Sequence, residues 1–78
     1  MFAPRPIRTP YLAQVADWIL SSVLRDPQWD VRAVGTVNLG SVFRETAWED
    51  RAKQEAQRLL GDPIAAIRRF AVVALREF

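Results

Sequence analysis

The sequence predicts an all-α domain of four helices, arranged as two stacked antiparallel helical hairpins. Apolar residues recur at the three- and four-residue spacing of an amphipathic helix, and no segment alternates apolar and polar residues as a strand would. Thr-Pro or Asp-Pro, a typical helix start, occurs three times. Part of the first half of the chain also recurs in the second half at a fixed offset. A compact four-helix bundle is the alternative arrangement of the same helices.

Composition excludes most familiar active sites. The chain has 78 residues, enough for one domain, and it contains no Cys and no His. Disulfides, thiolate ligands, cysteine nucleophiles and the commonest general base are therefore absent. The aspartates stand near expected helix N-termini, which favours their charged form, and no phosphate-binding glycine loop is present. We expect a protein that is not an enzyme and that needs neither a cofactor nor a metal.

Charge and hydropathy give no sign of a polyanionic or membrane partner. The formal net charge is +2, which is mild for a nucleic-acid-binding domain. No apolar run approaches the ~20 residues that span a bilayer, and the N-terminus lacks the apolar core of a signal peptide. We therefore expect a cytoplasmic protein. Pro4 and Pro6 predict an extended segment over residues 1–9, followed by one two-repeat domain over residues 10–78.

The first two helices are expected from their start signals. Thr9-Pro10 and Asp26-Pro27 each combine an N-cap residue with Pro at the first helical position. They predict helices over about 10–25 and 27–44. The second helix is apolar on more than one side, which places it in the middle of the fold. A close helix crossing at Gly35 would offset the helix propensity lost at that glycine.

The last two helices follow the same logic. Thr46 and Glu49 fit a capping box, in which each side chain accepts a backbone N–H of the other end of the turn. This predicts a helix over about 47–60, which Gly61 ends. Asp62-Pro63 then begins a helix that continues to the C-terminus.

An internal repeat relates the second helix to the fourth at an offset of 36 residues. Six of the nineteen aligned pairs from 24/60 to 42/78 are identical: Leu24/Leu60, Asp26/Asp62, Pro27/Pro63, Arg32/Arg68, Val37/Val73 and Leu39/Leu75. Val31 and Ile67 are a close match. A period of this length is typical of stacked helical hairpins.

The repeated motif Asp-Pro-x-x-x-Val/Ile-Arg, at 26–32 and 62–68, resembles the HEAT repeat. The resemblance covers two repeats, at about 10–44 and 46–78. It implies that Asp26, Asp62, Arg32 and Arg68 form a ladder between neighbouring repeats. The alternative is that each Asp is an N-cap alone and each Arg is solvated. Neither possibility gives these residues a catalytic role, and the repeat by itself says almost nothing about function.

Two surfaces are candidate binding sites. On the last helix, Phe70 and Val73, with Ala66, are expected to form an uncovered apolar stripe, because no third repeat follows. A compact bundle would bury the same stripe. The ridge of second helices is the other candidate, and it comprises Trp29, Ala33, Thr36, Gly40 and Phe43 in the first repeat and Ala65, Arg69, Val72 and Arg76 in the second. Trp18 and Tyr11 are expected to serve packing rather than recognition.

The sequence therefore predicts a non-enzymatic protein–protein interaction module: an inhibitor, immunity factor or adaptor, either dimeric or bound to a protein partner. Phe70, Val73, Ala66, Trp29, Arg69, Val72 and Arg76 are the expected partner-binding residues. A small nucleic-acid-binding protein that uses Arg69, Arg76, Arg32 and Arg44 is the first alternative. A piece of a longer helical-repeat scaffold is the second.

Overall fold

The computed structural model describes the backbone over residues 5–78 and the side chains from residue 13 onward, and this part of the chain contains no strand. In order, its elements are α1 (Arg5–Ser21), the 3₁₀ helix η1 (Val23–Arg25), α2 (Trp29–Val37), α3 (Leu39–Phe43), α4 (Glu49–Leu59) and α5 (Ala65–Glu77). The prediction of an all-α protein is confirmed. The number of helices is larger than expected, because the first two predicted helices are each interrupted.

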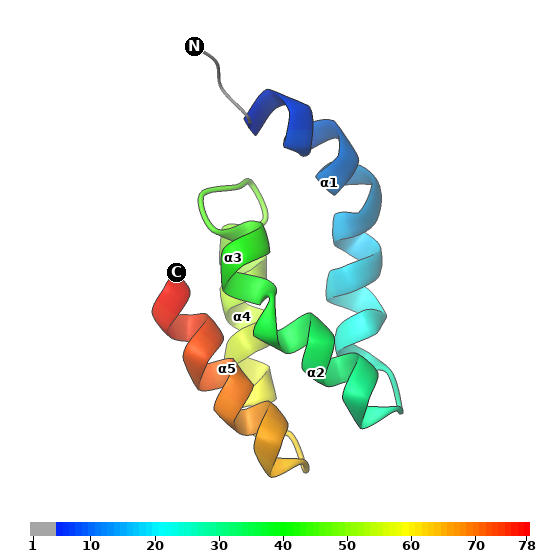
Figure 1. The fold of residues 1–78 in the computed structure, drawn as a ribbon, viewed down its shortest axis with the longest axis vertical. Coiled ribbons are helices and arrows are strands. Elements are labelled where there is room, and N and C mark those ends of the chain that lie inside the picture. Colours follow the sequence, from blue (N-terminus) through cyan, green and yellow to red (C-terminus); the bar gives the residue numbers. More distant parts are fainter. Residues whose placement is uncertain (1–4) are drawn as a thin grey trace.

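The helices form a slab of 43 × 23 × 17 Å. In Figure 1, α1 lies on one side, α2 and α3 occupy the middle, and α5 lies on the opposite side with α4 behind it. The helix pairs α1/α2 and α4/α5 each run in opposite directions in this view. Within the described residues, α2 packs chiefly against α5, whereas α1 is linked to α2 mainly through η1. This arrangement leaves a gap between α1 and α2.

The core lies where α2, α3, α4 and α5 meet, with the C-terminal half of α1 at its edge. Small side chains dominate it: Ala16, Ala33, Ala52, Ala56, Ala71 and Ala74 are all buried. Larger apolar side chains fill the space between these alanines, and they are Leu20, Leu24, Leu39, Phe43, Leu59 and Ile67. Because alanine brings helix backbones close together, the short helices reach a dense packing with few large residues.

The first helix begins earlier than the sequence indicates. Since α1 starts at Arg5, the predicted extended segment is wrong for residues 5–9, and residues 1–4 lie outside the described part of the chain. Pro6 is the second residue of α1, in the first turn, where a missing N–H removes no helical hydrogen bond. Pro6 is therefore compatible with helix.

The Asp-Pro motifs stand before their helices rather than at the first turn. Asp26 Oδ1 accepts the N–H of Gln28 at 2.8 Å, and Asp62 Oδ1 accepts the N–H of Ile64 at 2.9 Å. Each aspartate thus closes an Asx turn, a local side-chain-to-backbone loop that mimics a backbone turn. The predicted N-caps are wrong by two residues, because α2 and α5 begin only at Trp29 and Ala65.

The second predicted helix, 27–44, is broken at Asn38. Its backbone leaves helical geometry there, with φ −97° and ψ −2°. Two side chains bond to carbonyls of the preceding turn: Thr36 Oγ1 donates to Arg32 O at 2.7 Å, and Asn38 Nδ2 donates to Val34 O at 2.8 Å. Such bonds compete with the helical ladder and bend helices. As a result, α3 leaves α2 at an angle, and it packs on α4 and α5.

The start of α4 departs from the expected capping box. Glu49 Oε1 accepts the N–H of Glu45 at 2.6 Å, rather than that of Thr46. Glu45 has a φ of 62°, the left-handed conformation that lets the chain turn sharply out of α3. Thr46 Oγ1 accepts the N–H of Trp48 at 3.2 Å, one residue short of the box position. Thr46 and Glu49 therefore both accept backbone N–H groups as expected, but the turn they close is tighter than a capping box.

Two glycines mark close helix crossings. A Cβ at Gly35 would lie 2.9 Å from both Val23 Cγ1 and Leu24 Cδ2, so the crossing predicted at this residue is confirmed. A Cβ at Gly40 would collide with Glu77 Cβ and would lie 3.0 Å from the carbonyl oxygen of Ala74. The contact between α3 and α5 therefore depends on the missing side chain of Gly40.

Replacing Gly40 with Ala is expected to lower the free energy of unfolding by about 1–2 kcal/mol, because overpacking against α5 outweighs the gain in helix propensity. Gly61→Ala is the matched control, since a Cβ there meets only Arg58 O, at an ordinary 3.6 Å. Urea denaturation followed by circular dichroism measures both. Equal stability of the two variants would show that the α3–α5 crossing tolerates a side chain.

A polar network between the repeats and an apolar groove beside it

The two copies of the repeated motif form the same local hydrogen bonds. Arg32 Nη1 donates to the carbonyl oxygens of Asp26 at 2.7 Å and of Pro27 at 3.3 Å. Arg68 Nη1 donates to those of Asp62 at 2.7 Å and of Pro63 at 3.1 Å. Together with the two Asx turns, these bonds fix each Asp-Pro loop onto the helix that follows it. The internal repeat in the sequence is therefore matched by equivalent hydrogen bonds in the structure.

A two-bond ion pair joins one repeat to the other. Arg32 Nε donates to Asp62 Oδ2 at 3.0 Å, and Arg32 Nη2 donates to Asp62 Oδ1 at 3.1 Å. The side chains are 14% and 5% exposed, so the pair is largely shielded from water. A paired geometry of this kind is the strong form of an Arg–carboxylate contact. Arg32 therefore binds its own loop through Nη1 and the next repeat through Nε and Nη2.

The ion pair keeps Asp62 charged. Burial raises the pKa of this carboxyl, but the hydrogen bond from Arg32 and that from the Ile64 N–H lower it, and the net result is a pKa below the ordinary value. Asp62 is consequently unsuited to act as a general acid. Its role in the structure is to receive Arg32.

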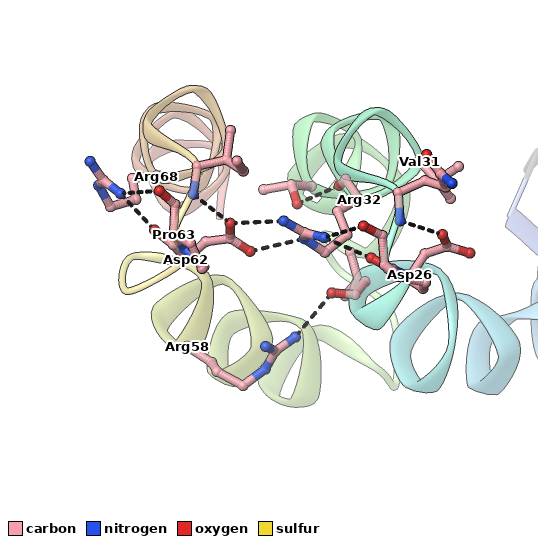
Figure 2. A network of polar contacts seen from close by, with 12 residues as sticks. Asp26, Val31, Arg32, Arg58, Asp62, Pro63 and Arg68 are labelled. Atoms are coloured by element: carbon pink, nitrogen blue, oxygen red, sulfur yellow. Dashed lines mark hydrogen bonds and ion pairs between the residues drawn. The ribbon is translucent and has the colours of Figure 1, made fainter.

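The network is open at both ends. Figure 2 shows Arg32 between the Asp26 and Asp62 loops, whereas Arg68 lies at the edge of the network, beyond Asp62 and Pro63. Within the described residues, Nε and Nη2 of Arg68 have no hydrogen-bond partner, and neither has Asp26 Oδ2. These are the atoms that, in Arg32 and Asp62, make or extend the contact between repeats.

A groove of about 630 Å³ lies between α1 and α2, next to the open Asp26 end of the network. Its walls are mainly apolar, and its lining residues are Trp18, Ile19, Ser22, Val23, Asp26, Asp30, Val31, Val34, Gly35, Asn38, Val42 and Phe43. Val34 and Trp18 are 63% and 61% exposed. Large apolar side chains that gather at one open groove are a feature of binding sites.

The structure corrects the expected position of the uncovered stripe. Phe70 is partly buried and packs against the core, and Ala66 is likewise half-buried, whereas Val73 is 43% exposed. On the same side of α5 as Phe70, one and two turns further on, Ala74 and Glu77 contact Gly40 of α3. This side of α5 therefore faces the first repeat. Val34, the equivalent of Phe70 in the first repeat, is the exposed residue.

The expected ridge of second helices is also largely internal. Ala33, Thr36, Gly40 and Phe43 are buried, and the prediction that they line a surface is wrong. The physical reason is that this side of α2 and α3 packs against α5. Trp29 remains half exposed, and Ala65, Arg69, Val72 and Arg76 are exposed on α5. Partner binding by these residues stays a prediction.

Sequence reasoning missed the groove. Trp18 was assigned to packing, yet it is exposed, and Tyr11 lies outside the residues whose side chains are described. The available signal was the second helix, which is apolar on more than one side. Val31 and Val34 on that helix stay 37% and 63% exposed, because α2 is linked to α1 mainly through η1.

Of the arginines in the nucleic-acid alternative, Arg32 is not free to bind phosphate. Arg32 is consumed by Asp62 and by its own loop, so it cannot bind phosphate without breaking the core of the network. Arg44, Arg69 and Arg76 are exposed. Both charged residues of the groove itself, Asp26 and Asp30, are acidic, which disfavours a polyanion there.

Over the described residues, no cluster of three or more potential metal-ligating side chains occurs, and no helix is both long and apolar enough to cross a bilayer. Comparisons with protein-family models, with curated proteins and with solved structures gave no match.

Replacing Asp62 with Asn removes the charge but keeps an acceptor for the Ile64 N–H, and we expect it to lower the free energy of unfolding at neutral pH by about 2 kcal/mol. Because folding lowers the pKa of Asp62, its contribution is complete above the ordinary value of 3.8 and is lost as the pH falls below it. The difference in the free energy of unfolding between wild type and variant should therefore become smaller in acid.

Asp26→Asn is the matched control, since Asp26 closes the same turn without an ion pair to another repeat. Urea titrations of all three proteins at several pH values measure the effect. The assignment of the stabilising charge to Asp62 would be contradicted if the stability difference between wild type and Asp62→Asn did not change with pH. It would also be contradicted if the two variants lost equal free energies of unfolding.

Proposed function

We propose that this chain is a non-enzymatic protein–protein interaction module, and that it binds an α-helical segment of its partner in the groove between α1 and α2. The observation that carries the proposal is the exposed apolar lining of that groove, with Trp18, Val31 and Val34 at its surface. Burying such side chains is the main favourable term in protein association.

The shape of the groove supports a helix as the occupant. One wall is formed by the end of α1, and the other is formed by α2 and α3, which contribute Val31, Val34 and Val42. An apolar groove between helices suits the apolar face of a further helix. Asp26 and Asp30 at the rim favour basic residues flanking that face.

The same features disfavour catalysis. No His or Cys is present in the sequence, and the ionisable lining of the groove consists of two aspartates without a basic partner in the groove. We further propose that the chain is a pair of stacked helical hairpins of the HEAT-like type. The equivalent hydrogen bonds at Arg32 and Arg68, and the link from Arg32 to Asp62, support this arrangement.

A photo-crosslinking amino acid at Ser22, an exposed residue of the groove lining, is expected to give a discrete adduct with a helical segment when irradiated in the native cells. The same amino acid at Gln57, exposed on α4, is the positional control. Val34→Asp should abolish the adduct, because a charge at the centre of the lining opposes an apolar helix.

Val73→Asp is the matched substitution on α5, and it should leave the Ser22 adduct unchanged. Both valines are exposed, so neither change is expected to unfold the protein. Mass spectrometry of the adduct identifies the contacted segment. No adduct at Ser22, or one that survives Val34→Asp, would overturn the proposal, and loss with Val73→Asp alone would favour α5 as the binding surface.

A further inference from the structure

The open ends of the polar network are complementary to each other. Arg68 at one end presents unpaired Nε and Nη2 donors, and Asp26 at the other presents an unpaired Oδ2 acceptor, within the described residues. Inside the chain, the equivalent pair is the bond between Arg32 and Asp62. The two ends thus carry the two halves of a contact that the protein already makes once.

We propose that the helix bound in the groove is α5 of a second copy of this chain, with Arg68 of one copy bound to Asp26 of the next. The inference rests on the proposed function, and it names the partner of the same groove. Association is head to tail: the α5 end of each copy covers the groove end of its neighbour. Such a heterologous contact leaves one free groove and one free α5, so it propagates into chains.

The repeat supplies the geometry of this contact. In the chain, Arg32 and the buried Thr36 and Leu39 of the first repeat face the second. Their equivalents are Arg68, Val72 and Leu75, which would face the next copy. The surface that receives them contains Asp26 and Val34, the equivalents of Asp62 and Phe70, and Val34 would be covered as Phe70 is covered.

Charge and hydrophobicity both match. The charged residues in the groove lining are Asp26 and Asp30. By contrast, α5 exposes Arg68, Arg69 and Arg76. Val72, at 39% exposed, and Val34, at 63%, are apolar residues that the described part of the chain leaves partly uncovered. A positive apolar helix therefore meets a negative apolar groove, which favours this docking over the contact of two identical ends.

One position limits how closely the copies approach. Gly40, which lets α3 lie against α5 inside the chain, is replaced by Arg76 at the equivalent position of the second repeat. The contact between copies is therefore looser at that end than the contact within the chain. We expect reversible, concentration-dependent association rather than a permanent dimer.

Sedimentation velocity over a range of concentrations tests the proposal. The average mass should rise above the 8.9 kDa of one chain as the concentration increases. Arg68→Ala and Asp26→Asn should each weaken association roughly tenfold, the effect of about 1.4 kcal/mol. Arg44→Ala, which removes the same charge from an exposed residue outside both α5 and the groove lining, is the control and should associate like the wild type.

Mixing the variants gives the sharper result. Arg68→Ala retains an intact groove and Asp26→Asn retains an intact α5, so a one-to-one mixture should form a heterodimer that grows no further. Val34→Glu and Val72→Glu, at exposed positions, form a second pair of end-blocked variants should Arg68→Ala be found unfolded by circular dichroism. A mixture of either pair that stays monomeric, with both variants folded, would refute head-to-tail docking.

The crosslink at Ser22 separates this inference from the proposed function. In a mixture of ¹⁵N-labelled and unlabelled purified protein, the adduct should join Ser22 to α5 of a different copy. A wild type that is monomeric at every concentration, while Ser22 crosslinks to another protein in cells, would overturn this inference and leave the proposed function intact. The absence of any groove-dependent adduct would overturn both.

Discussion

The structure depends on a single arginine that binds in two directions. Arg32 donates to the carbonyls of its own Asp-Pro loop and, through its remaining nitrogens, to the carboxylate of Asp62 in the next repeat. The guanidinium carries several N–H donors held in one plane, so it can bind both groups at once. A lysine has no such planar, preorganised fork. This ion pair, largely shielded from water, joins the two halves of the molecule beside the apolar core.

The alanine-rich core and the two glycine contacts let the helices pack closely around the ion pair between Arg32 and Asp62. Helices that approach closely bury backbone and small side chains, and they leave little room for large apolar residues. The large residues that remain are partly displaced to the surface, as Trp18 and Val34 show. A compact core and an uncovered groove are thus two consequences of the same packing. The proposed binding groove is the surface that remains uncovered when α2 packs closely on α5.

Several features could be predicted from the sequence. Apolar periodicity gave the all-α class, and the offset of 36 residues related Arg32 to Arg68. The repeat resemblance implied a ladder of Asp and Arg residues between repeats, and the structure contains one such bond, from Arg32 to Asp62. The turns were less predictable. Asp26 and Asp62 close Asx turns two residues before their helices, and Glu49 bonds one residue earlier than a capping box requires. These shifts arise because aspartate, asparagine and threonine form several local hydrogen bonds of similar energy.

What the sequence alone determined is the set of helices and the identity of the repeated residues, because both follow from spacing along one chain. Only the tertiary structure decided which side of each helix meets a neighbour. Phe70 and Val34 occupy equivalent positions, yet one is packed and the other is exposed, since Phe70 lies against the core whereas Val34 faces the open groove. Helical periodicity identifies an apolar face, but the direction of stacking between repeats decides whether that face is covered.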